Sequence, residues 1–307
     1  MLSALLTLIL RDHAGFFKLR AQTRTGGFMP LVGGVAVFLS VFLAFFFLYL
    51  ENKEAMSSNF FLRPLVLIPF FLLGLFDDWK NFKALPKLLG FFLALTAAAW
   101  LYRGENYLWL FLAAAFFFSN SFNFLDNADA HLTSALLGIF LASAMLSPTV
   151  ENRLFGFLFF AALLGFLFFN LPGRASAFLG DAGSLALGVA ALLVVLGVAS
   201  YEGGISFPIA LTLLAFPIYD TFAVMTLRLW RGQNPTIGGQ DHFSHRLMRA
   251  GVSLTLIDTA TFLLCGPLAY ILIRFFPGLG YFSSFIIFFL LLFTDLFFAG
   301  KTVNNPS

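Results

Sequence analysis

The sequence predicts an all-α polytopic integral membrane protein, a helix bundle with about 10–11 transmembrane helices. Two observations predict this class. First, 60% of the 307 residues are apolar and only 11% are charged, whereas a soluble domain is nearer half apolar and a quarter charged. Second, the apolar residues form long continuous runs, as membrane-spanning helices of roughly 20 residues require. Membrane-spanning β-strands would instead alternate over about ten residues.

The apolar runs follow one another without a repeat or a low-complexity linker. They lie near residues 1–10, 30–50, 64–76, 88–102, 107–125, 132–147, 154–171, 184–200, 206–229, 254–275 and 281–299. The first run has about half the usual length of a span. It lacks the basic start and the cleavage site of a signal peptide, so we interpret it as a short first span. Eleven spans would occupy about 220 residues, which predicts one transmembrane domain over 1–307.

The connections between the runs form two alternating sets, one plain and one rich in polar residues. The polar set lies at 11–29, 77–87, 126–131, 172–183 and 230–253. These loops, the helix ends beside them and the tail hold thirteen of the 18 Lys and Arg residues, whereas all five Glu residues lie in the plain set. Because positively charged loops stay in the cytoplasm, we expect a multi-pass protein of the inner (plasma) membrane with a cytoplasmic active face.

Composition also restricts the partners of the chain. The net charge is only +3, and Cys265 is the single cysteine, so an internal disulfide is excluded. We expect the lipid bilayer as a partner and no nucleic acid, and a second copy of the chain is a further candidate partner.

The first polar motif pairs Asp77 with Asp78 at the end of an apolar run. Neighbouring carboxylates repel each other unless a cation lies between them. A divalent metal would supply that cation, and so would a lysine such as Lys80, Lys83 or Lys87. The alternative is a solvated helix end with local ion pairs.

The second polar motif closes a run of Phe, Ala and Leu. On a continuous helix, one half would carry five polar residues: Asn120, Asn123, Asp126, Asn127 and Asp129. Such groups are expensive in contact with lipid, so we expect this half to face the bundle interior or water. The alternative is interhelical hydrogen bonding and a frayed helix end.

The third motif is Gly180-Asp181-Ala182-Gly183-Ser184, directly before a run. Asp181 or Ser184 could simply cap the helix. The functional interpretation is a metal-binding carboxylate beside glycines that admit a diphosphate, with the positive helix end adding to the attraction.

The fourth motif is the loop that carries His242, His245 and Arg246. A zinc site is disfavoured because the loop offers no cysteine and no third ligand. Beside Arg231 and Arg249, these residues suggest a clamp for an anion. The alternative is a basic loop that contacts anionic lipid headgroups.

Three acids lie inside apolar runs. Asp220, in the sequence Phe-Pro-Ile-Tyr-Asp, is a candidate functional residue because intramembrane acids are costly. We expect Asp258 and Asp295 to serve helix packing or interface positions.

Taken together, carboxylates with Mg²⁺ would bind a diphosphate, and the cations would hold the remaining phosphate charge. Because an apolar bundle would hold a lipid, the sequence predicts phosphoryl chemistry on a lipid at the membrane face.

In this order, the motifs resemble the polyprenyl-phosphate N-acetylhexosamine-1-phosphate transferases, a family of the glycosyltransferase family 4 type. The matching pieces are Pro30–Gly34, Gly74–Asp78, Lys87–Gly90, Asn120–Asp129, Gly180–Ser184 and Asp241–Leu247. The family includes relatives of the phospho-MurNAc-pentapeptide translocase and of undecaprenyl-phosphate GlcNAc-1-phosphate transferase. The histidine motif here, with Phe243 and Ser244 between the two histidines, fits the simpler sugar transferases better than the pentapeptide translocase.

The resemblance implies a reaction and its residues. A polyprenyl (undecaprenyl) phosphate would attack the β-phosphorus of a UDP-N-acetylhexosamine, with N-acetylglucosamine the favoured sugar, and would give polyprenyl-diphospho-sugar and UMP. The implied cofactor is Mg²⁺, with Mn²⁺ as an alternative. The resemblance implies Asp181 as the metal ligand, Asp77 and Asp78 as the catalytic acidic pair, and Asn123, Asp126 and Asp129 for nucleotide binding and catalysis. It also implies Lys87, His242 and His245 for substrate binding. From the residues themselves we add Asp77 as a second metal ligand and Asn120, Asp220 and Arg246 for substrate binding.

Two questions stay open from sequence. Another UDP-sugar would use the same chemistry, and an ion-coupled secondary transporter would instead use intramembrane acids such as Asp220. A non-enzymatic scaffold gives no reason for clustered acids.

A phosphate monoester is largely dianionic at neutral pH, because its second pKa is about 6. We therefore favour direct attack by the lipid phosphate over a covalent phosphoryl-enzyme.

Overall fold

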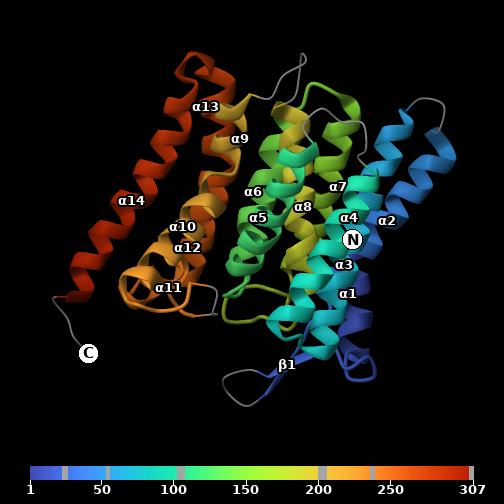
Figure 1. The fold of residues 1–307 in the computed structure, drawn as a ribbon, viewed down its shortest axis with the longest axis horizontal. Helices are drawn as coiled ribbons and strands as arrows, with labels where there is room; N and C mark the ends of the chain where they lie inside the picture. Colours follow the sequence, from blue (N-terminus) through green and yellow to red (C-terminus); the bar gives the residue numbers. More distant parts are fainter. Residues whose placement is uncertain (23–26, 53–55, 102–107, 200–205, 236–238, 304–307) are drawn as a thin grey trace.

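The computed structural model describes residues 1–22, 27–52, 56–101, 108–199, 206–235 and 239–303 as a helix bundle with one small β-ribbon (Figure 1). In chain order the elements are α1 (Leu2–His13), β1 (Arg20–Gln22), β2 (Phe28–Pro30), α2 (Gly33–Asn52), α3 (Ser58–Lys80), α4 (Ala84–Leu101), α5 (Leu108–Leu125), α6 (His131–Leu146), α7 (Val150–Leu167), α8 (Gly180–Ala199), α9 (Phe207–Leu213), α10 (Ala215–Trp230), α11 (Phe243–Arg249), α12 (Leu254–Leu263), η2 (Leu264–Leu268), α13 (Ala269–Phe275), η3 (Pro277–Leu279) and α14 (Tyr281–Val303). The two strands pair antiparallel, with Arg20 opposite Pro30.

The described helices fit a polytopic membrane bundle. Six of them are long and apolar enough to cross a membrane, and the pair α9–α10 makes a seventh if it is one bent span. Three further apolar helices have fewer than 18 residues, at Leu85–Leu101, His131–Leu146 and Tyr281–Phe297. The expected total of ten or eleven is therefore reached only if these shorter helices are also counted as spans.

Helix α8 is the most enclosed of the spans, with 89% of its apolar window buried. Glycines let its amino end approach α2 and α3 at backbone distance. A Cβ on Gly74 would lie 2.2 Å from the carbonyl oxygen of Asp181, and a Cβ on Gly34 would lie 2.3 Å from the backbone nitrogen of Gly183. This close packing fixes Asp181 beside the end of α3.

Phenylalanine fills much of the core around α2 and α7. Phe140 stacks on Phe159 with ring centroids 5.1 Å apart, and Phe38 stacks on Phe71 at 4.9 Å. Such pairs add to the stabilisation from burial and give the many phenylalanines of the sequence a structural role.

Two apolar runs are broken within the membrane region. Helices α9 and α10 meet at an angle of 70° around Leu214. Pro217 lies in the first turn of α10. Because proline has no backbone N–H, it cannot continue the hydrogen-bonding pattern of α9. Between α12 and α13, Pro267 lies in the π-helical turn η2, which keeps the two segments in one span from Leu254 to Phe275.

The polar segments differ in detail from the loops that the sequence predicts. Helix α5 ends at Leu125, so the segment from Asp126 to Asp129 is a turn and not a helical face. The amide of Asn127 donates to the carbonyl of Phe124 at 2.8 Å, a local bond that competes with further helix. Elsewhere, α3 continues to Lys80, and a short helix, α11, lies within the loop 230–253.

Candidate active site

The end of α3 turns the two neighbouring carboxylates in different directions. The helix stops at Asn81, which has a left-handed backbone conformation, and the N–H of Phe82 donates to Asp77 at 2.7 Å. Asp77 is only 7% exposed, and its other oxygen lies 2.6 Å from the ammonium of Lys87.

Lys87 joins Asp77 to Asp181. Its ammonium lies 2.6 Å from Asp77 and 2.5 Å from Asp181. The lysine enters from the first turns of α4, just after Pro86. The sequence predicts a cation near the acidic pair, and in the structure that cation bridges the two motifs.

Asp78 caps α8 from a neighbouring helix. Its two carboxylate oxygens accept the backbone N–H groups of Asp181 at 2.8 Å and Ala182 at 2.9 Å. Gly180 adopts φ +72°, and a Cβ there would lie 2.6 Å from Asp78. The expected helix cap at this motif thus comes from α3, and it leaves the side chain of Asp181 available to face the site.

Asn123 brings α5 into the same cluster. Its amide donates to Asp181 at 2.9 Å and lies 2.9 Å from the hydroxyl of Ser184. Asp77, Lys87, Asn123 and Asp181, from four helices, thus form one hydrogen-bonded group, which we call the acidic cluster. Each of these four residues is a candidate from the sequence.

Asp126 lies next to the acidic cluster in the turn after α5. Burial raises the pKa of Asp126 to about 8, and the negative charges of Asp181 and Asp78 add to this effect. At neutral pH the carboxyl is therefore mostly protonated, unless a cation offsets the neighbouring charges.

A second group forms around the histidine motif. His242 Nδ1 lies 2.7 Å from buried Asp220, whose other oxygen accepts the N–H of Phe243 at 2.6 Å. Arg246 makes a two-pronged contact with Asp295 on α14, at 2.8 and 2.6 Å, and lies 4.0 Å from Asp220. We call these residues the histidine–arginine group.

The two groups meet through the turn after α5. The hydroxyl of Ser244 lies 2.9 Å from the side-chain oxygen of Asn127, and the ring of Phe124 lies 6.2 Å from that of His242. His245 is buried beside His242, with ring centroids 6.4 Å apart. The residues therefore lie at one end of the bundle, around the amino end of α8.

Two candidates bond elsewhere. The amide of Asn120 donates to the carbonyl of Phe116 in its own helix at 2.8 Å. Asp129 accepts the N–H of Gly173 at 3.1 Å. Because α5 ends before Asp129, Asp129 does not continue the helical face that carries Asn120 and Asn123. Their predicted roles remain predictions.

Asp295 binds Arg246 and Tyr219, a pairing that is not predicted from the sequence. The hydroxyl of Tyr219 donates to the same carboxylate that holds Arg246. The available signal is that an intramembrane acid needs a partner, but sequence spacing does not reveal a partner 49 residues away. Asp258, which the sequence suggests for helix packing or an interface, lies 2.9 Å from His131 in the buried contact of α6 and α12.

The donor chemistry of the acidic cluster suits Mg²⁺. This ion binds through one or two carboxylates together with water and substrate phosphates. Asp77 and Asp181 both face a single cationic centre, the ammonium of Lys87, which stands where a divalent ion would satisfy both carboxylates. Among the described residues, no group of three acidic, histidine or cysteine side chains is arranged as a metal site.

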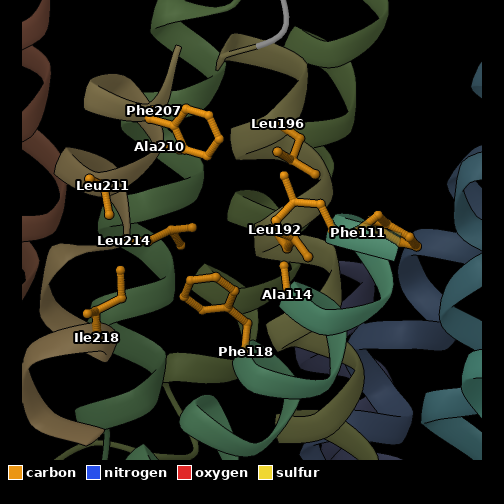
Figure 2. Close-up of a pocket in the computed structure, with 11 residues that line it drawn as sticks. Phe111, Ala114, Phe118, Leu192, Leu196, Phe207, Ala210, Leu211, Leu214 and Ile218 are labelled. Atoms are coloured by element: carbon orange, nitrogen blue, oxygen red, sulfur yellow. The ribbon is translucent and has the colours of Figure 1, made fainter. Parts of the chain in front are cut away.

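An apolar cavity of about 200 Å³ lies between α5, α8 and the bent pair α9–α10 (Figure 2). Phe118, Leu192 and Leu214 project into it from the three sides. Leu192 lies eleven residues beyond Asp181 on α8, which corresponds to about 16 Å along a helix. A long hydrocarbon chain could therefore reach from the acidic cluster into this cavity.

The fold is that of a polytopic membrane helix bundle with a polar cluster at the amino end of one buried helix. Residues 60–199, which carry all four residues of the acidic cluster, match the family described as glycosyl transferase family 4. The match covers somewhat less than half of the chain, and it includes four of the motifs that carry the resemblance in the sequence.

Curated relatives agree with the family match. The chain is 28% identical over 256 residues to the undecaprenyl-phosphate alpha-N-acetylglucosaminyl 1-phosphate transferase of Yersinia pestis, and the alignment covers 75% of this chain and 68% of that protein. The Escherichia coli K12 protein of the same name is 26% identical over the same shares. A probable undecaprenyl-phosphate N-acetylglucosaminyl 1-phosphate transferase of Bacillus subtilis is 29% identical over 182 residues, which are 58% of this chain and 51% of the relative.

Proposed function

We propose that the chain transfers N-acetylhexosamine 1-phosphate, preferentially N-acetylglucosamine 1-phosphate, from a UDP-sugar to polyprenyl phosphate. The observation that carries this proposal is the placement of Lys87 between Asp77 and Asp181 at the amino end of α8. Carboxylates, a cation and a helix amino end together suit a diphosphate with its metal. The names of the relatives support undecaprenyl phosphate as the acceptor.

In the proposed reaction, an oxygen of the lipid phosphate attacks the β-phosphorus of the UDP-sugar. A new P–O bond forms to the lipid phosphate as the bond to UMP breaks, and UMP leaves with that electron pair. The acceptor is largely dianionic at neutral pH, so it needs little general-base help. Direct attack is therefore our preferred route over a phosphoryl-aspartate.

Each part of the site has a proposed task. Asp77 and Asp181 would hold Mg²⁺, which supplies charge neutralisation at the transferred phosphoryl group. Lys87 would then bind phosphate oxygens, and Asn123 would keep the Asp181 carboxylate oriented. Asp78 would act indirectly, because both of its oxygens already hold the backbone of α8.

The histidine–arginine group would bind the remaining phosphate charge. His242 is oriented by Asp220, which accepts from Nδ1 if the ring carries its proton there. In the neutral ring, Nε2 would then accept a hydrogen bond. In the charged ring, Nε2 would also carry a proton and would donate a hydrogen bond to a phosphate oxygen. Arg246, held by Asp295, would add a fixed positive charge beside this histidine.

The apolar cavity would take part of the polyprenyl chain. Its lining is hydrocarbon on all sides (Figure 2), and burial of each CH₂ group contributes about 0.8 kcal/mol. The excess of Lys and Arg in the polar loops favours a cytoplasmic orientation of the acidic cluster, in the inner membrane where a UDP-sugar would be available.

One feature favours the transporter alternative, namely a broken helix pair with an intramembrane acid. Asp220 on α10 is that acid. Both of its oxygens, however, are occupied by His242 and by the backbone of Phe243, which favours a positioning role.

The test is release of UMP by the purified full chain with undecaprenyl phosphate, Mg²⁺ and a panel of UDP-sugars. We expect UMP with one sugar, dependent on lipid and metal, and a loss of at least about 100-fold in Asp181→Asn, as for other electrostatic catalytic groups. Glu151→Gln is a matched control because, within the described residues, this glutamate accepts hydrogen bonds from the backbone N–H and hydroxyl of Ser57, outside both polar groups of the site. Silence with every sugar from folded protein would count against the proposal.

A further inference from the structure

A larger cavity, of about 710 Å³, lies on the other side of α10 between α10, α11 and α14. Its apolar wall includes Phe222, Leu292 and Leu296, all of which are exposed at the bundle surface. Its polar end is formed by Arg231, Arg246 and Arg249 with Asp295 and Tyr219. The cavity therefore combines a hydrocarbon-lined length with a charged end.

Helix α10 separates this cavity from the apolar one described above. Ile218 faces the first cavity and Tyr219 faces the second, as neighbours about 100° apart on a helix can. The second cavity is thus a different compartment from the space assigned to the polyprenyl chain.

The lining of the charged end holds more cations than acids, although Asp241, outside the lining, pairs with Arg231. Three arginines line it against one carboxylate, that of Asp295. That carboxylate is occupied by Arg246. Arg231 lies 3.0 Å from Asp241, while Arg249 donates to a backbone carbonyl, that of Gln240, at 2.9 Å.

Arginine suits a phosphate group at this position. Its planar fork matches phosphate oxygens, and positive residues beside a membrane attract anionic headgroups. An occupant must therefore place an anion at Arg231 and Arg249 and a hydrocarbon chain along Phe222 and Leu292. The opening of the apolar wall at the bundle surface makes the bilayer itself the source of such a molecule.

We propose that the cavity between α10, α11 and α14 is a binding site for an anionic phospholipid of the bilayer. The phosphate-bearing headgroup lies at Arg231 and Arg249, and an acyl chain lies between α10 and α14. This site is independent of the transferase reaction proposed above, because its evidence and its test concern lipid binding alone.

The test measures lipid binding to the full chain in detergent. Phosphatidylglycerol should raise the midpoint of thermal unfolding by several degrees more than phosphatidylcholine with the same acyl chains. Native mass spectrometry should show phosphatidylglycerol retained. Arg249→Gln should lose most of this difference, because it removes charge from the headgroup end and Arg249 makes no ion pair with any of the residues that the structure describes.

Two further variants keep the result interpretable. Ala223→Trp, on α10, would fill the apolar length and should abolish retention while the arginines remain. Arg153→Gln is the matched control, since Arg153 is also exposed and also donates to a backbone carbonyl, that of Ser147, at 3.1 Å. It should leave the lipid difference unchanged. Only variants that unfold at the wild-type midpoint without lipid are compared.

Two outcomes would overturn the proposal. Equal stabilisation by the two phospholipids, or full retention in both Arg249→Gln and Ala223→Trp, would show that the cavity has no anionic-lipid site. If undecaprenyl phosphate alone gave stabilisation that these variants removed, the cavity would belong to the acceptor instead. None of these readouts uses transferase activity, so failure here would leave the proposed function standing.

Discussion

Asp78 accepts the backbone N–H of Asp181 at 2.8 Å, a bond that ties the end of α3 to the start of α8. Its neighbour Asp77 instead faces Lys87. Two adjacent acids thus have different partners, one a helix backbone and the other a side-chain cation.

We expect Asp78→Asn to lower stability and Asp77→Asn to lower activity. Asp78→Asn places an amide NH₂ against a backbone N–H and should cost about 1–3 kcal/mol of stability. Asp77→Asn should remove activity with a smaller change in stability, because Lys87 keeps Asp181 as its partner. Thermal unfolding and UMP release check both, with Asp12→Asn as an exposed control. Equal loss of stability in the two variants would contradict this division.

Lys87→Met should change the response of the protein to divalent cations. Without the ammonium, Asp77 and Asp181 repel each other, so Mg²⁺ or Mn²⁺ should raise the unfolding midpoint more than in the wild type. Activity should fall, because the phosphate-binding cation is gone. Lys80→Met is the control, since Lys80 lies over the ring of Trp79. An unchanged metal response in Lys87→Met would show that Asp77 and Asp181 do not bind the ion.

Asp126 should make stability fall as pH rises. Burial raises the pKa of Asp126 to about 8, whereas an unfolded aspartate titrates near about 3.9. Between these values the folded protein binds the additional proton, so this contribution is fully present below about pH 4 and is lost as pH rises through about 8. Unfolding midpoints of metal-free protein across this range should fall more steeply than those of Asp126→Asn. Parallel curves would refute the assignment.

Asp295→Asn should loosen the histidine motif. The change removes the charge that holds Arg246 by two contacts, and because the pair is only partly buried, we expect a loss of about 1.5–3 kcal/mol, as for hydrogen bonds to charged groups. Tyr219→Phe removes one hydrogen bond from the same carboxylate and should cost only about 1 kcal/mol. Chemical denaturation measures both. A larger loss in Tyr219→Phe than in Asp295→Asn would be inconsistent with this arrangement.

Gly74→Ala should separate α3 from α8. The added Cβ would lie 2.2 Å from the carbonyl oxygen of Asp181, so the helices must move apart and the acidic cluster must open. We expect a loss of about 1–3 kcal/mol from overpacking together with lost activity. Gly278→Ala meets nothing within 4 Å and should be neutral in the same unfolding and UMP assays. Wild-type behaviour of Gly74→Ala would show that the close approach is not required.

The helical class and most of the acidic cluster could be predicted from the sequence. Long apolar runs have few alternatives to helix in a membrane, and Asp77, Lys87, Asn123 and Asp181 stand out among apolar neighbours. The division of labour between Asp77 and Asp78 could not be predicted, because it depends on how α3 meets α8. The contact between Arg246 and Asp295 was missed for a similar reason, since it joins α11 to the last helix.

The residues at which helices end could not be predicted from the sequence either. The polar face expected from Asn120 to Asp129 assumes a continuous helix, whereas Asn127 bonds back to Phe124 and the helix stops at Leu125. Such local competition between side chain and backbone depends on a few hydrogen bonds. Helical periodicity does not report it.

The position of Lys87 has a consequence for the order in which ligands arrive. While the lysine bridges Asp77 and Asp181, the two acids carry their own counter-ion and have little free charge with which to attract a lone divalent ion. In the proposed function, the ammonium must leave both carboxylates before they can act as ligands, and once released it is free to meet phosphate. Metal and nucleotide would therefore enter together, as one complex, and initial-rate kinetics would show their concentrations acting as a single substrate.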